Sequence, residues 1–304
     1  MEKRKTTFAL GTGGWEHEAF DDVLYPAPHL SSQQKLAYYS RFFDSVEVRS
    51  TFWDDSVTAR DAGEWIAAVA GNKRFTFNIK LHLQFTHKKI FKPELTRNVR
   101  GILQELARND RLGSLLIQFP YSFTNTSAHR FHLVKLAEVF SGFRSCVEFR
   151  HESWNQGNVW ELIRDHGLNS VSPDLPRVKQ LMSYATTVGG DRVYVRLHGR
   201  NENGWLLNGM ETRYDYLYNS REIRELARRL NHLAEKCGHV TVICNNTTKG
   251  KAVATAFQLL SAVHGKRVDV APRTLQAFPH LHDVADLNLL DAPPLAAPTY
   301  KQAM

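Results

Sequence analysis

Eight short segments recur along the chain, and in seven of them polar or charged residues occupy one alternating face. In the fifth segment, Val147 and Phe149 share one parity, while Glu148 and Arg150 share the other. Successive side chains of a β-strand point to opposite faces, so this alternation predicts strands with one apolar and one polar side. The predicted strands are Phe8–Gly11, Ser45–Ser50, Arg74–Lys80, Ser114–Pro120, Ser145–His151, Leu168–Asp174, Arg192–Gly199 and His239–Asn246.

Amphipathic stretches with apolar residues three and four positions apart follow most of these strands, and this spacing predicts helices. We expect Ser127 and Ser220 to cap helix N-termini, and Gly167 and Gly238 to terminate helices. The predicted helices are Ser31–Phe43, Ser56–Ala70, Leu95–Arg111, Ser127–Phe140, Asn158–Asp165, Ser220–Lys236 and Gly250–Val263.

The strand–helix repeat predicts an α/β protein with a TIM-type (β/α)8 barrel, eight parallel strands enclosed by helices. Residues 175–191 show no convincing helix, so the connection after the sixth strand is expected to be irregular. We expect one barrel domain over residues 1–285, and we expect the segment Arg267–Leu290 to wrap the outside of the barrel. Residues 286–304, with prolines among alanines, are expected to form a disordered tail.

The polar parity places many ionisable side chains inside the predicted barrel, near the strand ends. A closed interior holds such charges only if they pair with one another or bind a ligand, because unpaired burial costs several kcal/mol per ion. A self-satisfied Glu–Arg network is therefore one interpretation, and an active site is the other. The predicted inward set is Glu47, Arg49, Lys80, Gln118, Glu148, Arg150, Asp174, Arg196, His198 and Asn245.

Three of these residues are candidates for proton transfer. Glu148 is the candidate general base or acid, because burial and the cation of Arg150 can tune its carboxylate. Glu47 would supply a second carboxylate, and His198 would donate to a substrate or shuttle a proton. The structural alternatives are a salt bridge from Glu47 to Arg49 and a hydrogen-bonded structural role for His198.

Two loops after the seventh and eighth strands are predicted to bind anions. They contain His198–Asn201 and Asn245–Lys251, and in this architecture such loops commonly hold phosphate. An ordinary capped helix with solvated lysines is the alternative. The candidate substrate-binding residues are Trp15, Arg49, Lys80, Gln118, Arg150, Trp154, Asp174, Arg196, Arg200, Asn245, Asn246 and Lys249.

The positions of the tryptophans are a second indication of a ligand-binding site at the rim of the barrel. Four of them follow predicted strands and are expected at the active rim, where indoles stack on sugars or bases. The alternative, favoured for any one of them taken alone, is that the ring plugs the barrel top. Two others lie on predicted helices and are expected in the core. The rim set is Trp15, Trp53, Trp154 and Trp205, and the core set is Trp65 and Trp160.

The net charge and the cysteines indicate which kinds of partner and which cellular compartment to expect. The net charge of +8 and the pI near 9.4 favour an anionic small molecule or a nucleic acid as partner. Cys146, Cys237 and Cys244 show no metal-binding spacing and leave one thiol unpaired, which is typical of a reducing compartment. The chain has no signal-peptide pattern and no run of about 20 apolar residues, so we expect a cytoplasmic protein without membrane spans.

A metal centre is not predicted, although a divalent ion is kept as an alternative. Glu47, Glu148, Asp174 and His198 would be its ligands if they converge, since barrels gather ligands from different strands. Arginines on the same strands would offset those carboxylates, and no HxH or HExxH pair is present.

The motifs resemble those of the YecE-like family, domain of unknown function 72, over Phe8 to Leu281. This resemblance implies a TIM-type barrel and supplies no reaction. Many members carry Asn at the position of Arg49 and Tyr at that of Trp53, so this chain is the more cationic. The resemblance rests on Gly11–Trp15, Val46–Val48, Phe75–Phe77 with Lys80, Thr86–His87, Leu116–Pro120, Val147–His151 with Trp154, Arg196–Arg200, Tyr214–Tyr216 with Tyr218, and Asn245–Asn246 with Gly250–Ala252.

Three functions are compatible with these residues. The first is an enzyme acting on a phosphate-bearing or otherwise anionic substrate, with carboxylate acid/base chemistry and Arg150, Arg196 and Arg200 as an anion clamp. The second is a metal-dependent phosphodiesterase or nuclease, by analogy with other barrels. The third is a non-catalytic nucleic-acid-binding adaptor that uses the surplus positive charge. The sequence predicts neither the reaction class nor the oligomeric state.

Overall fold

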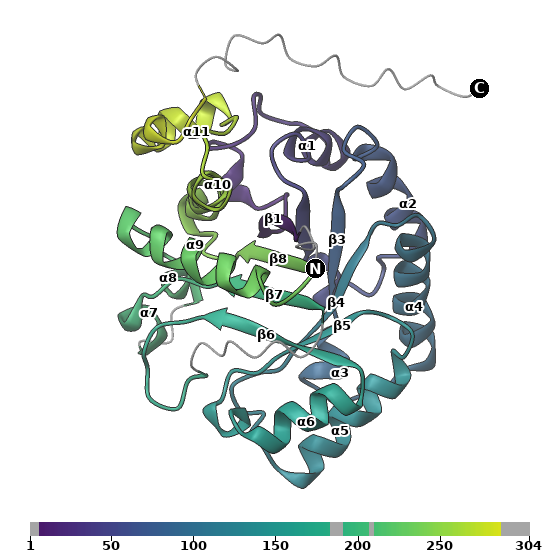
Figure 1. The fold of residues 1–304 in the computed structure, drawn as a ribbon. Helices are drawn as coiled ribbons and strands as arrows, with labels where there is room; N and C mark the ends of the chain where they lie inside the picture. Colours follow the sequence, from purple (N-terminus) through teal and green to yellow (C-terminus); the bar gives the residue numbers. More distant parts are fainter. Residues whose placement is uncertain (1–5, 183–190, 207–209, 287–304) are drawn as a thin grey trace, which may run out of the picture.

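Eight parallel strands form a closed barrel in chain order, with the last strand paired to the first (Figure 1). The computed structural model describes residues 6–182, 191–206 and 210–286. The predicted TIM-type barrel is therefore confirmed. The strands are β1 Thr7–Gly13, β2 Ser45–Val48, β3 Thr76–Lys80, β4 Leu112–Gln118, β5 Ser145–Glu148, β6 Leu168–Asp174, β7 Arg192–Leu197 and β8 His239–Cys244.

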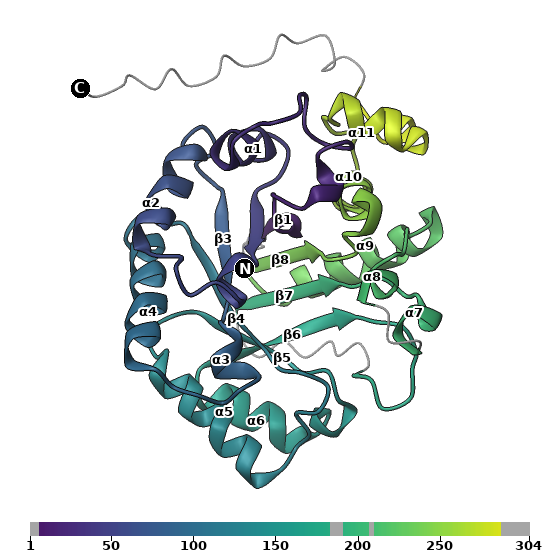
Figure 2. The ribbon, with the colours of Figure 1, turned by 180° about the vertical axis from the view of Figure 1, so that it is seen from behind.

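Helices surround the barrel as an outer layer, and each predicted helix is present (Figure 2). The short α3, α7 and α8 lie in the connections, and so do 3-10 turns such as η1 (Glu18–Phe20), η2 (Ser50–Phe52), η3 (Glu152–Trp154) and η4 (Thr248–Gly250). The helices are α1 Ser32–Tyr39, α2 Ala59–Ala68, α3 Leu83–Thr86, α4 Pro93–Arg108, α5 Ser127–Val139, α6 Gly157–Asp165, α7 Glu202–Leu206, α8 Met210–Arg213, α9 Ser220–Ala234, α10 Lys251–His264 and α11 Pro272–Ala277.

Two predicted helix caps and one predicted terminator are wrong. The N-caps of α5 and α9 are Thr126 and Asn219, one residue before the predicted serines, because their side chains accept the free N–H groups of the first turn. Gly167 follows α6 with a φ of 66°, as predicted for a terminator. Gly238 does not terminate α9. It packs against Asp191, whose carboxylate oxygens would lie 2.8 and 2.9 Å from an added Cβ.

The connection after β6 contains no helix within its described residues 175–182, in agreement with the predicted irregular crossover. Leu181 forms an antiparallel bridge with His151, and residues 183–190 lie outside the described part. Beyond α10, α11 and η5 (Pro279–Asp283) return along the barrel's exterior, and Val268 pairs with Ala285. The predicted disordered tail comprised residues 286–304. Asp286 is described and its backbone N–H donates to Val268 O, whereas residues 287–304 lie outside the described part.

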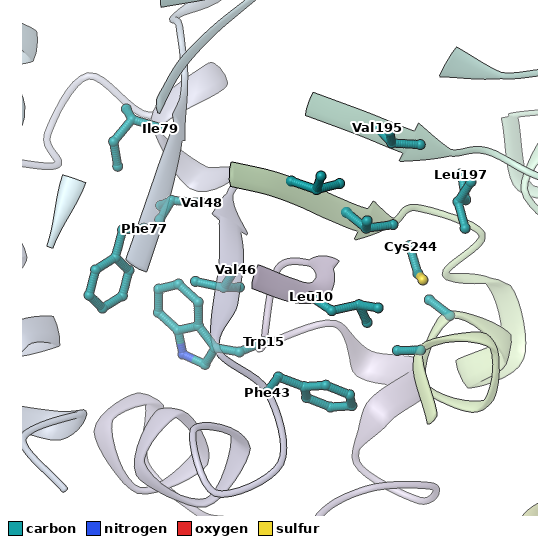
Figure 3. Packing of buried hydrophobic residues seen from close by; sticks show 14 of the residues in the cluster. Leu10, Trp15, Phe43, Val46, Val48, Phe77, Ile79, Val195, Leu197 and Cys244 are labelled. Atoms are coloured by element: carbon teal, nitrogen blue, oxygen red, sulfur yellow. The ribbon is translucent and has the colours of Figure 1, made fainter. Parts of the chain in front are cut away.

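The apolar parity of the strands faces the helices and forms one large core. Val46 and Val48 of β2 and Phe77 of β3 belong to it, together with Leu197 of β7 (Figure 3). A smaller cluster from the opposite parity fills the barrel interior: Leu116, Cys146, Val171, Tyr194 and Ile243. The apolar residues of most strands therefore face the helices and their polar residues face the barrel interior, as the alternation predicted. The polar residues of the inner face lie beside this second cluster.

β6 is the exception to this pattern. Asp174 is in register with Leu197, and adjacent residues of parallel strands point to the same side, so Asp174 faces outward. The predicted inward position of Asp174 is thus wrong. Val171, in register with Tyr194, faces the interior instead. The outer face of β6 carries Ser170, Ser172 and Asp174, and Asp174 is buried and paired with Arg200 there, so the usual polarity of the two faces does not apply to this strand.

Two of the four tryptophans expected at the rim lie in the core. Trp154 is fully buried, stacks on Phe149 at 4.2 Å between ring centroids, and donates its indole N–H to Phe123 O. Trp15 is also buried and packs edge-on against Trp65 at 5.8 Å. Trp15 and Trp154 were predicted to contact a substrate, but their buried rings are not accessible to one. Trp53 is 57% exposed.

Trp65 and Trp160 pack against the core from α2 and α6, as predicted. The described residues include no helix that is both long enough and apolar enough to cross a membrane.

Replacing Trp154 and Trp53 by alanine tests this division of the tryptophans. Trp154→Ala removes a buried ring and its hydrogen bond, so we expect a loss of about 3–5 kcal/mol in the free energy of unfolding. Trp53→Ala removes an exposed ring and should change that energy by less than about 0.5 kcal/mol. Urea denaturation followed by circular dichroism measures both. Equal losses in the two variants would show that the assignment of Trp154 to the core is wrong.

Candidate active site at the carboxyl end of the barrel

A buried chain of charges spans the barrel interior, and we call it the carboxylate–arginine bridge: Glu47, Arg196 and Glu148. Nη2 of Arg196 lies 2.7 Å from Oε1 of Glu47, and its Nη1 lies 2.5 Å from Oε2 of Glu148. The carboxylates come from β2 and β5, while the guanidinium comes from β7 on the other side of the closed sheet. All three side chains are at most 2% exposed. The fold thus brings together the predicted charges from three separate strands.

Other inward side chains hold the two carboxylates in place. The hydroxyl of Tyr194 donates to Oε2 of Glu47 at 3.1 Å. Oε1 of Glu148 lies 2.6 Å from Nε of Arg150 and 3.2 Å from Nε2 of His198. Every oxygen of the bridge therefore faces at least one donor or cation.

His198 is oriented from its other ring nitrogen. The amide of Asn245 lies 3.0 Å from Nδ1 of His198. When that amide donates, the neutral ring carries its proton on Nε2, which faces Glu148. Burial and the nearby Arg150 lower the pKa of His198 to about 3, against the opposing effect of Glu148. His198 is consequently neutral at physiological pH, and its Nε2 faces Oε1 of Glu148 at 3.2 Å.

Glu148 and Arg196 stay charged over the whole physiological pH range. Burial alone would raise the pKa of Glu148, but Arg150 and Arg196 outweigh it and hold that pKa well below its usual range. Burial likewise works against the charge of Arg196, yet Glu148 and Glu47 raise the pKa of Arg196 above its ordinary value. Glu148 thus carries no proton to donate, which disfavours the general-acid role predicted for it, and its low pKa makes it a weak base.

Lys80 behaves differently, because no carboxylate is paired with it. Its amine lies 3.7 Å from the ring centroid of Phe52 and makes no hydrogen bond or ion pair with the described residues. Burial and the charge of Arg196 lower the pKa of Lys80 to about 7; Arg49 and Arg150 act in the same direction, and Glu47 opposes them. A substantial fraction of Lys80 is therefore neutral amine at neutral pH.

Arg49 lies beside the end of β1. An added Cβ on Gly13 would lie 3.3 Å from Cδ of Arg49 and 2.5 Å from Oδ1 of Asn245, so only glycine permits this close approach. Burial lowers the pKa of Arg49 and Glu47 opposes that effect, but the guanidinium stays protonated. Arg49 forms no ion pair with the described residues. This region thus has more cations than carboxylates.

An aromatic group lies beside these cations. The guanidinium of Arg150 lies 5.4 Å from the ring of Trp205, and Tyr214 is 6.3 Å from Trp205 and 6.0 Å from His198. Of the four tryptophans expected at the rim, Trp205 is the one found next to the charge cluster. Trp205, Tyr214, Phe52 and Arg49 are half-buried and form the more exposed part of the site.

Several of these contacts were not predicted from the sequence. Tyr194 shares its parity with Arg196 and His198, so the alternation contained the signal for it. Phe52 lies in η2 and Tyr214 in the loop after α8, where no alternation applies. Gln118 is inward, in register with Glu148, but its amide donates to Phe119 O at 2.7 Å.

A separate network holds several residues predicted to bind substrate. Arg200 pairs with both oxygens of Asp174 at 2.9 and 2.8 Å, and the hydroxyl of Tyr218 donates to Asp174 at 2.7 Å. Arg200 also lies 3.2 Å from Glu222 of α9. Arg200 was predicted to belong to the anion clamp, and this prediction is wrong, because two carboxylates, Asp174 and Glu222, already neutralise its charge.

The loop after β8 is likewise occupied by structural contacts. The amide of Asn246 donates to Tyr216 O and to Thr255 Oγ1. The side chain of Lys249 is 76% exposed, 3.9 Å from Asp215, and Asp215 is also paired with Lys251. The predicted anion role of Asn246 and Lys249 gains no support from these contacts.

The candidate metal ligands do not assemble into a set. Asp174 faces outward, whereas Glu47, Glu148 and His198 are bound to the inner network. Within residues 6–182, 191–206 and 210–286, no three His, Cys, Asp or Glu side chains are grouped as metal ligands. The divalent ion stays the untested alternative that the sequence left open.

Comparisons with known proteins agree with the sequence motifs and the barrel. The family model described as "Protein of unknown function DUF72" matches residues 9–278. The UPF0759 protein YunF of Bacillus subtilis is 27% identical over 286 residues, covering 88% of this chain and 99% of that protein. A DUF72 family protein of Thermotoga maritima superposes with a TM-score of 0.75 at 30% identity, covering 85% of this chain and 99% of the other.

A DUF72 family protein of Enterococcus faecalis has the same fold, with a TM-score of 0.75 at 23% identity, over 88% of this chain and 98% of the other. The resemblance drawn from the motifs is thereby confirmed, since the YecE-like family and DUF72 are the same family. The family model spans most of the barrel, including β1 to β8. This chain belongs to the DUF72 family.

Proposed function

We propose that the carboxyl end of the barrel is the active site of an enzyme that acts on a small anionic substrate. Arg49 and Arg150 would bind the anionic group, and the neutral Lys80 amine would accept a proton. The observation that carries this proposal is the excess of cations: the guanidinium groups of Arg49, Arg150 and Arg196 against two carboxylates, Glu47 and Glu148.

The charge excess supports anion binding because the bridge already uses both carboxylates. Arg196 contacts both of them, and Arg150 lies against Glu148. Arg49 and Lys80 are left with no paired carboxylate among the described residues. A substrate with a phosphate or carboxylate group would supply the missing negative charge, through strong charge-assisted hydrogen bonds.

The acid/base chemistry follows from the pKa values. A general base works best when its pKa lies near the operating pH, and the pKa of Lys80 is lowered to about 7. Glu47, Glu148 and His198, the catalytic candidates from the sequence, would instead fix the electrostatic environment of Lys80. The sequence-based hypothesis of carboxylate acid/base catalysis is thus refined toward a lysine base.

The metal-dependent phosphodiesterase and the nucleic-acid adaptor remain alternative proposals. No specific contact of the described residues favours either of them over the anion-binding enzyme.

Inorganic phosphate or pyrophosphate should raise the melting temperature of the wild-type protein. A ligand present at about 100 times its Kd stabilises the folded state by about 2.7 kcal/mol, which differential scanning fluorimetry detects. Arg49→Ala should abolish the rise, because it removes an unpaired cation. Lys249→Ala, which changes an exposed lysine outside the cluster, is the matched control and should keep it. A rise equal to that in chloride of the same ionic strength, or its loss in Lys249→Ala only, would contradict the proposed site.

The lowered pKa of Lys80 predicts a pH-dependent stability difference from Lys80→Met. The folded-state pKa is about 7 and the unfolded value about 10.5, so the unfolded chain binds more protons between these pH values. The cost of burying the ammonium is complete below pH 7 and is relieved as the pH rises. Lys80→Met should therefore be the more stable protein at pH 6, and its advantage should fall by about 2–3 kcal/mol at pH 9.

Urea denaturation of both proteins at each pH measures this difference, and titrations common to both cancel. The groups that act on Lys80 are Glu47, Arg49, Arg150 and Arg196, and His87 is coupled to it in turn. An advantage of Lys80→Met that is the same at pH 6 and pH 9 would mean that the amine titrates normally.

A further inference from the structure

Lys80 combines three properties that proton transfer alone does not require. It lies at the last position of β3, on the inner face of the barrel, in register with Leu116. Its amine rests on the ring of Phe52 at 3.7 Å and has no hydrogen-bond or ion-pair partner among the described residues. The residue itself is 9% exposed. A neutral amine held in this way has its lone pair available for a bond to carbon.

We propose that Lys80 is a covalent nucleophile that forms an imine with an anionic carbonyl compound, either a 2-oxo acid or a phosphorylated aldehyde or ketone. This inference rests on the proposed anion site and specifies the substrate that the site takes.

The same guanidinium groups would serve two purposes. Arg49, Arg150 and Arg196 disfavour a further positive charge on Lys80, which keeps part of the amine neutral and nucleophilic. A bound phosphate or carboxylate group would then interact with the unpaired cations beside the amine. This places the reacting carbonyl of a short substrate near Lys80, so that the binding energy of the anion orients the reaction.

The step balances without an oxidant or reductant. The amine lone pair attacks the carbonyl carbon, and the electrons of the C–O double bond move to oxygen, which takes the proton released by nitrogen. The resulting carbinolamine loses its hydroxyl group with one proton from solvent, as water, and leaves a protonated imine.

The positive charge of the imine would be stabilised by two nearby groups. Glu47 is the carboxylate that raises the pKa of Lys80, opposing the effect of burial and of the guanidinium groups. The Phe52 ring, directly beneath the nitrogen, adds a cation–π contact. The arrangement therefore favours both the neutral nucleophile and its cationic product, provided that the substrate brings its own negative charge.

Borohydride trapping tests the proposal on the full-length protein at pH 7. At this pH the neutral fraction of an amine with a pKa of about 7 is roughly a thousandfold that of an ordinary lysine. Pyridoxal 5′-phosphate serves as the phosphorylated aldehyde, pyruvate as the 2-oxo acid, and 5′-deoxypyridoxal, which lacks the phosphate and cannot close a hemiacetal, as the control without an anionic tail. After reduction, mass spectrometry of the intact protein and of its peptides locates the adduct. We expect one rapid adduct on Lys80 from at least one anionic probe, at least tenfold faster than from 5′-deoxypyridoxal.

Two variants and one competitor test whether the rapid adduct is specific to Lys80 and depends on the anion site. Lys80→Arg should lose the rapid adduct, and Lys249→Arg, at an exposed lysine, should keep it. Inorganic phosphate should slow labelling of wild-type Lys80, a measurement that does not depend on any variant folding correctly. Labelling by pyridoxal 5′-phosphate alone would identify a phosphorylated carbonyl compound as the substrate class, and labelling by pyruvate alone a 2-oxo acid.

The outcomes separate this inference from the proposed function. If phosphate stabilises the protein through Arg49 but no probe labels Lys80 faster than exposed lysines, the covalent role is wrong and the anion site stands. Equal labelling by 5′-deoxypyridoxal and by the anionic probes would overturn the substrate class. If phosphate neither stabilises the protein nor slows labelling, the anion site itself is wrong.

Discussion

The burial of Arg196 between Glu47 and Glu148 is the interaction on which the rest of this barrel depends. Taking carboxylates out of water is costly, and removing one partner of such a buried pair typically costs about 3–5 kcal/mol, because an uncompensated charge remains. The guanidinium satisfies both carboxylates at once, at 2.7 and 2.5 Å. Since its partners come from β2 and β5, the charges are compensated only when the barrel closes. Barrel closure and charge neutralisation inside it are therefore coupled.

The bridge also determines the electrostatics of its neighbours. Its carboxylates are occupied by Arg196, Arg150 and Tyr194, so they are poorly available to Arg49 and Lys80. The interior consequently has a positive excess next to an amine that carries a lowered pKa. The proposed anionic substrate and the proposed reactive lysine both rest on this single imbalance. The network around Asp174 and Arg200, in contrast, is balanced and fastens the loop after β7 to α9.

The alternation of polar and apolar residues predicted the site where two conditions held: a strand was covered by a helix outside, and its pattern was regular. β2, β5 and β7 satisfy both, and Glu47, Glu148 and Arg196 were correctly expected to converge. β6 is covered by α6 but lacks the regular pattern, since its polar residues lie on the outer face, so Asp174 was placed on the wrong face. The predicted rim position of two tryptophans was wrong for another reason. Position after a strand does not say whether an indole turns toward the mouth or back under the helices, as Trp154 does.

By itself, the sequence determined the eight strands, the helices between most of them, the family, and the ionisable residues of the inner face except on β6, where Asp174 was misplaced. These features are local, because they depend on periodicity and on the residue types at each strand end. Only the tertiary structure decided which charges pair. Glu47 and Arg196 are 149 residues apart, and a pairing across a closed sheet is a matter of register and reach. That pairing left Lys80 without a carboxylate, so its lowered pKa is a property of the fold that no segment of the chain carries alone.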